Sequence, residues 1–280
     1  MTAVNTNTTT VEMMTNKVSS AFQRGSYDPY LRRKTAPPIE KSWLEMQAKA
    51  ILALSDREIL DAAFLENELI PTLGLNDELL EEQPPEFSES FGKGIFLWQY
   101  PNQVAAFLAH LAKVRPPVSH YLEVGSRWGG MFFLMTMWLK RVSGESFSAG
   151  TALDLVSEPP LVEAFRTMGS QFGLEITYLQ KDSHDEVVES YVADNKPDIV
   201  LIDGEHSVQA ALHDHMMVLD AADWIIHHDI SNDSLPQLRF LFDSLARLSV
   251  AEFESQKFDH QYKSVGGSHL GIGLLTRKLR

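Results

Sequence analysis

Tyr121-Leu-Glu-Val-Gly-Ser-Arg-Trp-Gly-Gly130 is the stretch that decides the fold of this chain. It reads as the end of a short apolar strand, a turn with three glycines in six positions, and the start of an apolar helix that continues from Met131. Glycine allows positive φ angles and lets a ligand approach the backbone closely. The free N–H groups at a helix start can bind polar or anionic groups. The stretch therefore predicts a strand–turn–helix unit with a ligand at its turn.

Glu123 is the unusual residue of this stretch, because it lies where a strand leaves the core. A carboxylate there is costly without a hydrogen-bonding partner. The turn lacks the full Gly-x-Gly-x-x-Gly pattern of dinucleotide-binding folds. A carboxylate beside it would repel a pyrophosphate and attract an ammonium group. We therefore predict a nucleoside ligand with a cationic amino-acid tail, and we disfavour the alternative of a nicotinamide-dependent oxidoreductase.

Outward from this stretch, predicted strands and helices alternate toward the C-terminus. Further strands are expected at residues 147–155, 174–179, 198–203 and 224–228, each followed by a helix, and a closing pair of strands is expected at 250–258 and 269–275. The run Asp198-Ile-Val-Leu-Ile-Asp203 has the nearly continuous apolar character of a buried parallel strand. Such alternation predicts an α/β fold with a doubly wound, mostly parallel sheet and helices on both faces.

Carboxylates stand at or just beyond the ends of the five predicted parallel strands. They are Glu123, Asp154, Asp182, Asp203 and Asp229. Ligands of open α/β sheets bind outside the carboxyl ends of the strands, and a carboxylate after the second strand typically accepts hydrogen bonds from ribose hydroxyls. Any one of these residues could be a capping residue, but five together indicate a functional edge. We expect Asp154 to bind a ribose.

A second group of candidate residues lies in Asp203-Gly-Glu-His206 and in His228-Asp229. Carboxylate oxygens with one imidazole can hold Mg²⁺ or Mn²⁺, so Asp203, His228 and Asp229 are the predicted metal ligands. His206 is the predicted catalytic base, because the pKa of histidine lies near neutral pH. The alternative is that the two aspartates cap strands and the histidines are incidental.

The stretch Tyr121–Gly130 resembles the first motif of class I S-adenosylmethionine-dependent methyltransferases, and the resemblance extends over roughly residues 92–277. The segment Ile202-Asp-Gly-Glu-His206, with His228-Asp229 after it, is similar to one branch of that family. That branch holds the macrocin and mycinamicin sugar O-methyltransferases and the proteins named cephalosporin hydroxylases. The resemblance implies a Rossmann-like, seven-stranded sheet whose last strand is antiparallel.

The resemblance also implies a binding site for S-adenosyl-L-methionine. It implies that the amino-acid part of the cofactor lies at the glycine turn, the ribose at Asp154, and the adenine beside Asp182 and Ser183. The cofactor-binding residues that we expect are Glu123, Gly125, Ser126, Arg127, Gly129, Asp154, Asp182, Ser183 and Asp203. Asp203 and Asp229 match the metal ligands of the family, and His206 matches its proposed base.

The sequence departs from the family pattern at His228, where relatives more often carry a carboxylate as a third metal ligand. A neutral imidazole there weakens the prediction of tightly bound Mg²⁺ and leaves room for a softer metal or none. We predict a metal-assisted O-methyltransferase that acts on a hydroxyl of a small secondary-metabolite or sugar-like substrate. The alternatives are a metal-independent methyltransferase and a non-catalytic cofactor-binding partner protein.

Composition limits the partners of this protein. The 280 residues carry a net charge of −14 and no cysteine. The acidic charge argues against nucleic acid and anionic membranes as partners. The absence of cysteine excludes disulfides and thiolate metal sites. Residues 1–20 lack the apolar segment of a signal peptide, and the longest apolar run, 130–139, is far shorter than the roughly 20 residues of a membrane span. We expect a cytoplasmic protein.

The sequence before the glycine turn predicts a tail and an extension. Residues 1–25 are expected to be a disordered tail, 26–90 a helical extension or lid, and 91–280 the cofactor-binding domain. Helices are predicted at 41–54 and 55–69, the second beginning with the capping box Ser55-Asp-Arg-Glu58, and a loop is predicted at 76–90. Such an extension can pair two subunits in a homo-oligomer.

Two further groups of polar and aromatic residues allow a structural interpretation. Trp98, Gln99, Tyr100 and Gln103 precede the turn, and they either pack a helix onto the sheet or form one wall of a ligand pocket. His213 and His215 lie on the helix after Asp203, and we expect them to be surface or packing residues.

Overall fold

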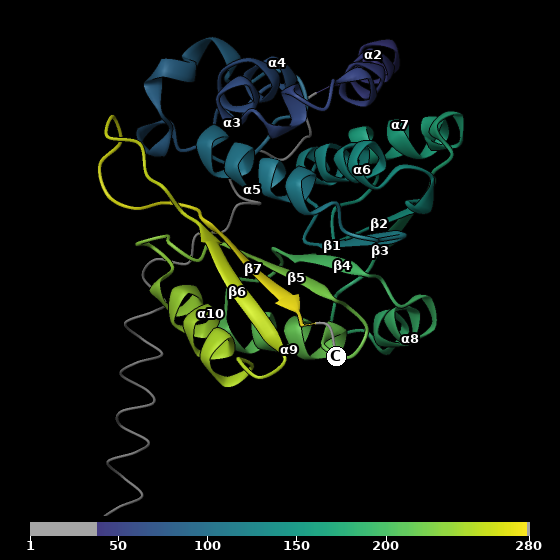
Figure 1. Cartoon of the computed structure of the whole chain (residues 1–280), viewed down its shortest axis with the longest axis vertical. Helices are drawn as coiled ribbons and strands as arrows, with labels where there is room; N and C mark the ends of the chain where they lie inside the picture. The colour runs from purple at the N-terminus through teal and green to yellow at the C-terminus, as the bar shows by residue number, and fades with distance from the viewer. Residues whose placement is uncertain (1–37, 279–280) are drawn as a thin grey trace, which may run out of the picture. The chain divides into compact units, whose positions relative to one another are not determined.

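A seven-stranded sheet organises the computed structural model, which describes residues 38–278 (Figure 1). The strands are β1 (His120–Val124), β2 (Ala149–Asp154), β3 (Glu175–Gln180), β4 (Ile199–Ile202), β5 (Trp224–His228), β6 (Phe253–Phe258) and β7 (Ile272–Arg277). Their order in the sheet is β3-β2-β1-β4-β5-β7-β6. Neighbours among β1 to β5 pair in parallel, and β7 pairs antiparallel with both β5 and β6. The predicted fold class is confirmed.

Six helices cover the two faces of the sheet (Figure 1). On one face lie α5 (Pro101–Val114), α6 (Gly130–Ser143) and α7 (Pro160–Met168), and on the other lie α8 (Glu186–Asn195), α9 (Val208–Val218) and α10 (Pro236–Leu248). Successive residues of β1 point to opposite faces, as in any strand. Tyr121 therefore packs in the cluster that contains Phe132 of α6, whereas Leu122 packs in the cluster that contains Val218 of α9.

Burial follows the position of each strand in the sheet. Every residue of β1 and β4, at the centre of the sheet, is buried. The edge strands β3 and β6 are partly exposed. This pattern explains why the central strands are nearly continuous apolar runs, since both of their faces are covered by helices.

The region before α5 corrects part of the prediction. Helix α2 (Lys41–Ala53) lies where it was expected, but a single helix over 55–69 was wrong. The capping box does form, because Glu58 N–H donates to Ser55 Oγ and Ser55 N–H donates to the Glu58 carboxylate, at 3.2 and 2.7 Å. It closes only the 3₁₀ turn η2 (Glu58–Leu60). Asp61 has an extended backbone (φ −91°, ψ 91°) that ends this turn.

Asp61 then caps the true second helix by accepting hydrogen bonds from the N–H groups of Ala63 and Phe64. That helix consists of α3 (Ala62–Phe64), the π-helical η3 (Leu65–Leu69) and α4 (Ile70–Leu73). The 3₁₀ turns η4 (Leu80–Glu82) and η5 (Pro85–Ser90) lie in the predicted loop. Two further 3₁₀ turns, η6 (Gly144–Ser146) and η7 (Gly169–Phe172), directly follow α6 and α7.

The helices before residue 91 share the core of the sheet. Leu44, Ile51 and Leu65 are fully buried in the same cluster as Phe107 and Phe132 of α5 and α6. They therefore add a layer to that core and do not form a second one. Residues 1–25, and residues 26–37 of the predicted extension, lie outside the described residues.

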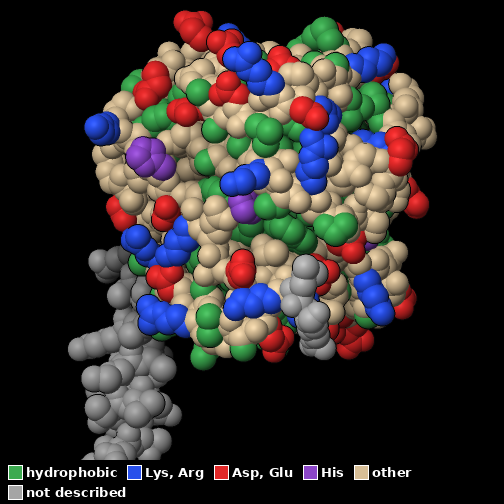
Figure 2. All heavy atoms as spheres, viewed as in Figure 1, with side chains coloured by type: hydrophobic (Ala, Val, Ile, Leu, Met, Phe, Trp, Pro, Cys, Tyr) green, Lys and Arg blue, Asp and Glu red, His purple; other side chains and the backbone are tan. Residues whose placement is uncertain are grey.

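The surface is mixed in charge on the face drawn in Figure 2, where acidic and basic side chains are interspersed. Among the helices of residues 38–278, none is long and apolar enough to cross a membrane.

Candidate functional site

Four of the five strand-end carboxylates lie in a row at the carboxyl edge of the sheet. Glu123 is near the end of β1, Asp154 ends β2, and Asp203 and Asp229 directly follow β4 and β5. The strands β2, β1, β4 and β5 are neighbours in this order. Asp182 follows the edge strand β3 at a distance of two residues. The sheet topology therefore brings together residues that are up to 106 positions apart in the sequence.

Glu123 is buried, with 2% of its surface exposed. Its carboxylate accepts a hydrogen bond from the hydroxyl of Tyr121, which lies on the same face of β1. Burial raises the pKa of Glu123 well above the usual carboxyl range, and the neighbouring Asp203 raises it further, whereas the bond from Tyr121 opposes the shift. An ionised Glu123 therefore requires a positive group beside it.

The glycine turn is held tightly by the rest of the protein. Gly125 has φ +85°, and a Cβ atom there would lie 2.0 Å from the backbone oxygen of Asp203. Gly129 has φ +90°, and a Cβ atom there would lie 2.4 Å from Val162 Cγ2. These two glycines are required by backbone geometry and by packing, independently of any ligand.

Asp154 connects the end of β2 to the turn. One of its carboxylate oxygens accepts the backbone N–H of Arg127 at 2.6 Å, and the other accepts that of Val156 at 2.9 Å. A carboxylate oxygen can accept more than one hydrogen bond, so the two backbone bonds do not exclude a ribose hydroxyl as a further donor. The structure thus gives Asp154 a definite capping role, and its predicted ribose contact stays a prediction.

Arg127 joins the turn to the extension. Its guanidinium group pairs with Glu78 at 2.9 Å and lies 4.4 Å from the ring centroid of Trp98. Glu78 was not identified from the sequence, because no local pattern links it to a residue 49 positions away. The polar atoms of Tyr100 and Gln103 bind protein groups, the carbonyl of Glu82 and the N–H of Gly271 respectively, as expected for packing residues.

Two buried polar atoms of the turn have no hydrogen-bond partner. They are Ser126 Oγ and Trp128 Nε1. Unpartnered buried polar atoms are rare in folded proteins and call for a specific explanation. A polar ligand at the turn would satisfy them.

Asp182 and Ser183 lie in the loop between β3 and α8. The Asp182 side chain is 60% exposed, and one of its oxygens lies 3.0 Å from both the backbone nitrogen and Nδ1 of His184. The hydrogen bond from the His184 backbone lowers the pKa of Asp182. No contact in the described chain tests the predicted adenine site.

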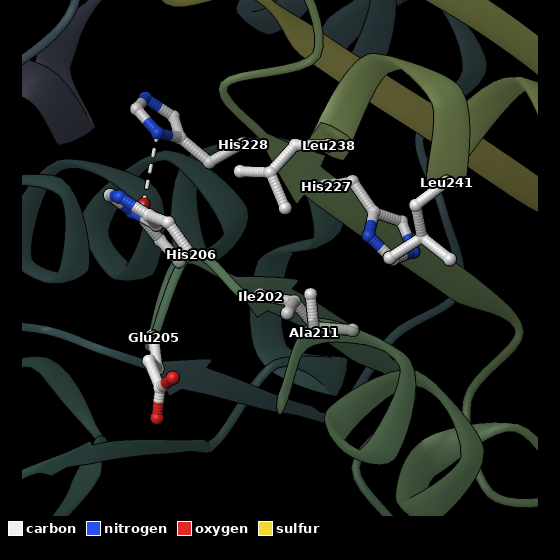
Figure 3. A pocket seen from close by; sticks show the side chains of 10 residues that line it. Ile202, Glu205, His206, Ala211, His227, His228, Leu238 and Leu241 are labelled. Carbon is white, nitrogen blue, oxygen red and sulfur yellow. Dashed lines mark hydrogen bonds and ion pairs between the residues drawn. The ribbon is translucent and has the colours of Figure 1, made fainter. Parts of the chain in front are cut away.

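Asp203, His206, His228 and Asp229 form one cluster beyond β4 and β5, which we call the β4–β5 cluster. His228 Nδ1 lies 2.9 Å from Asp203 and 3.5 Å from Asp229. His206 Nε2 lies 3.3 and 3.7 Å from the same two carboxylates. Figure 3 shows the imidazoles of His206 and His228 together at one end of a small pocket, whose other end is lined by His227, Leu238 and Leu241.

Electrostatic coupling controls the charges of this cluster. Burial opposes the charged form of His228, but Asp203 and Asp229 outweigh it and raise the pKa of His228 well above its ordinary value. Burial likewise opposes ionisation of Asp229, but His228 outweighs it and lowers the pKa of Asp229. Without a bound cation, the imidazolium form of His228 is therefore favoured, and its single positive charge offsets one of the two carboxylates.

The same cluster has the geometry of a metal site. Ligand atoms of Asp203, His206 and Asp229 lie within 4.8 Å of one another. The sequence assigned His228 as the nitrogen ligand and His206 as the base, and the structure places both imidazoles against the same carboxylates. Asp229 has a positive φ of +58°, an uncommon conformation for a residue other than glycine.

Comparison with known proteins gives a likeness of fold. No protein-family model matches the sequence, and no curated protein matches it. The MycE methyltransferase from the mycinamycin biosynthetic pathway, solved with Mg, SAH and mycinamycin VI, is 15% identical, with 65% of this chain and 51% of that chain covered at a TM-score of 0.44. This chain thus spans about half the length of MycE.

Two further solved structures give similar values. A putative RNA methyltransferase from Pyrococcus horikoshii is 10% identical, with 85% of this chain and 100% of that chain covered at a TM-score of 0.43. A cyclopropane-fatty-acyl-phospholipid synthase-like protein from Lactobacillus casei is 15% identical, with 63% and 91% covered at a TM-score of 0.41. Similarity at this level concerns the fold at most, so the function has to be argued from the site.

Proposed function

We propose that this protein is an S-adenosylmethionine-dependent O-methyltransferase that acts on a hydroxyl group of a small secondary-metabolite or sugar-like molecule with the help of a divalent cation. The observation that carries the proposal is the row of carboxylates at one edge of the sheet. Glu123 and Asp154 flank the glycine turn, whereas Asp203 and Asp229 lie with two histidines. The first pair suits a cofactor with a cationic tail, and the second pair suits removal of a proton.

Cofactor binding would use the carboxylates and the Ser126 hydroxyl around the glycine turn. The ammonium group of the cofactor would compensate the buried carboxylate of Glu123. The Ser126 hydroxyl, which has no partner, would bind its polar atoms. Asp154 would accept a ribose hydroxyl in addition to its two backbone N–H groups, and Asp182 with Ser183 would lie beside the adenine. When bound, S-adenosylmethionine supplies an electrophilic methyl group.

Proton removal would fall to His206. Burial lowers the pKa of His206, but the bond to Asp203 and the charge of Asp229 outweigh it and raise the pKa above its ordinary value. A divalent cation on the two aspartates would offset this effect, return His206 to the range of a base at neutral pH, and polarise the substrate hydroxyl. His206 Nε2 would then accept the hydroxyl proton.

A metal-independent methyltransferase is the second candidate, and one observation favours it. His228 already places a positive charge 2.9 Å from Asp203 and 3.5 Å from Asp229. This internal cation can offset one of the two carboxylate charges without a metal. The acidic net charge of −14 supports a small-molecule substrate over nucleic acid or an anionic membrane in either case.

The first experiment is calorimetry of the full chain with S-adenosylmethionine, followed by a turnover assay with a panel of hydroxylated acceptors. Binding with turnover supports a methyltransferase. Binding without turnover on any acceptor supports a non-catalytic cofactor-binding partner, and absence of binding refutes both. Turnover is then measured after EDTA treatment and after addition of Mg²⁺, Mn²⁺ or Zn²⁺, and EDTA-insensitive turnover selects the metal-independent candidate.

A homo-oligomer formed through the N-terminal helices is a separate proposal. Met46 and Leu60 in this region are 55% and 51% exposed, so they are apolar side chains that a partner subunit could cover. Light scattering on wild type and on the Met46→Glu, Leu60→Glu double variant tests it. A monomeric wild-type protein would refute it.

A further inference from the structure

We propose that His184, His213 and Asp214 form a second metal site, distinct from the β4–β5 cluster and suited to Zn²⁺ or a similar transition-metal ion. His184 lies in the loop between β3 and α8, and the other two residues lie on α9. Their ligand atoms all lie within 4.8 Å of one another. The proposal goes beyond the proposed methyl transfer, because none of the three residues belongs to that site.

The two histidines are oriented as metal ligands usually are. His184 Nδ1 lies 3.0 Å from Asp182, and His213 Nε2 lies 3.2 Å from Glu189. If these nitrogens carry the protons that the carboxylates accept, the lone pairs are on His184 Nε2 and His213 Nδ1. An outer carboxylate that fixes the tautomer in this way is typical of histidines bound to metals. The two rings are close, with centroids 4.2 Å apart.

Asp214 is the second, independent observation that points to a cation. The residue is fully buried, at 0% exposure. Ser183 and His213 come close to its carboxylate, but neither oxygen has a hydrogen bond of ordinary geometry. His213 Nδ1 is also buried without a partner and lies 3.7 Å from Asp214 Oδ1. A buried carboxylate without compensation costs several kcal/mol, and a shared cation would satisfy both groups.

The ligand types select the ion. Two imidazoles and one carboxylate suit zinc and its neighbours, whereas Mg²⁺ and Ca²⁺ prefer all-oxygen sites. Ligand atoms about 2.1 Å from a tetrahedral zinc ion are roughly 3.4 Å apart, close to the 3.7 Å between His213 and Asp214. The bound ion would join the β3–α8 loop to α9, with Asp214 against Gly204 at the end of β4.

The test uses the untagged full chain, stripped with EDTA, and Zn²⁺ alone as the probe. The Asp203→Asn, Asp229→Asn double variant serves as the background, because it disables the β4–β5 cluster. We expect this background to bind one Zn²⁺ by calorimetry and to gain several degrees in Tm. In that background, His184→Gln and His213→Gln should each weaken zinc affinity about tenfold or more, and Glu189→Gln should weaken it less.

The control is His260→Gln, which changes an exposed histidine far from both clusters in the sequence. His184 is 40% exposed, so its replacement is compatible with folding, and circular dichroism without metal verifies this. Substitution by Co²⁺ gives a second measurement, since a tetrahedral site shows visible absorption that His184→Gln should remove. Failure of the background variant to bind Zn²⁺, or unchanged affinity in both histidine variants, would overturn the proposal. Neither result bears on cofactor binding.

Discussion

Two clusters of histidine and carboxylate lie near the same edge of the sheet, and they balance charge in opposite ways. In the β4–β5 cluster, His228 contacts Asp203 directly at 2.9 Å, so the imidazole and the carboxylate neutralise each other. In the second cluster, His184 and His213 direct one nitrogen each to outer carboxylates, and the buried Asp214 has no hydrogen bond of ordinary geometry. The same residue types therefore make one site in which an imidazole contacts a carboxylate directly, and another in which the buried carboxylate lies 3.7 Å from His213, as the proposed cation site would need.

A third pair of histidines completes this comparison. His215 and His227 are buried and lie 3.1 Å apart, and no carboxylate contributes to their titration. Burial lowers the pKa of His215 to about 4 and that of His227 to about 3. The carboxylates that face an imidazole thus decide whether it is charged, since burial alone favours the neutral form.

The largest expected effect concerns the base in the β4–β5 cluster. His206→Gln should lower methyl-transfer turnover by about 10²–10⁴-fold, because glutamine cannot accept the substrate proton. Affinity for S-adenosylmethionine should stay within about threefold of wild type, since His206 is not among the residues assigned to the cofactor. Steady-state kinetics and calorimetry measure both quantities, with His260→Gln as the matched control. Turnover close to wild type would remove His206 from the mechanism.

Replacing a buried aspartate by asparagine should have opposite effects on stability in the two clusters. In EDTA at pH 7, Asp229→Asn should lower the free energy of unfolding by about 3 kcal/mol, because it leaves the buried charge of His228 with one carboxylate. Asparagine tolerates the positive φ at this position, so the substitution adds little backbone strain to the measured free energy of unfolding. Asp214→Asn should raise the free energy of unfolding by about 1 kcal/mol by removing a buried charge whose burial outweighs the nearby imidazoles and Ser183. Urea unfolding measures the free energy of unfolding of both variants. If both substitutions change it in the same direction, the contrast between the two clusters is contradicted.

The pH dependence of stability tests the third pair. The folded pKa values of His215 and His227 lie below the ordinary value of 6.5, so below pH 6.5 the unfolded chain binds more protons. Stability is therefore present above pH 6.5 and is lost as the pH falls toward 4. Between pH 6.5 and 5 the loss should be about 1.6 kcal/mol for each histidine, because the limiting slope of about 1.36 kcal/mol per pH unit is reached only well below pH 6.5.

Urea unfolding at pH 7, 6 and 5 measures this loss, and His227→Gln should flatten the profile by about half. If the free energy of unfolding of the wild type falls with pH no more steeply than that of the variant, the pKa values of His215 and His227 are not lowered by burial.

The smallest expected effect concerns the cap at the end of β2. Asp154→Asn keeps one side-chain acceptor for the N–H groups of Arg127 and Val156, so it should lower the free energy of unfolding by only about 1 kcal/mol. Its affinity for S-adenosylmethionine should fall about tenfold if a ribose hydroxyl binds there. Calorimetry and urea unfolding separate the two roles. A stability loss without any loss of affinity would leave Asp154 as a capping residue alone.

Most of the sheet could be predicted from the sequence, because each central strand is a short apolar run that ends at a carboxylate or a glycine. Residues 224–228 match β5 to the residue, and the other strand boundaries lie within about three residues. The helix expected over 55–69 was wrong. The capping box at Ser55 starts only one 3₁₀ turn, and Asp61, three residues after Glu58, ends that turn and caps a new helix. Local patterns do not identify which of two competing caps starts a long helix.

The sequence by itself determined the strand–turn–helix unit at Tyr121–Gly130 and the set of strand-end carboxylates, since both depend on residue types at fixed spacing. Only the tertiary structure decided which charges face each other. The bond of Arg127 to Glu78 and the meeting of His184 with His213 depend on how strands and helices pack. Protonation of an imidazole is set by groups within a few ångströms, and their identity is known only once distant segments of the chain are in contact.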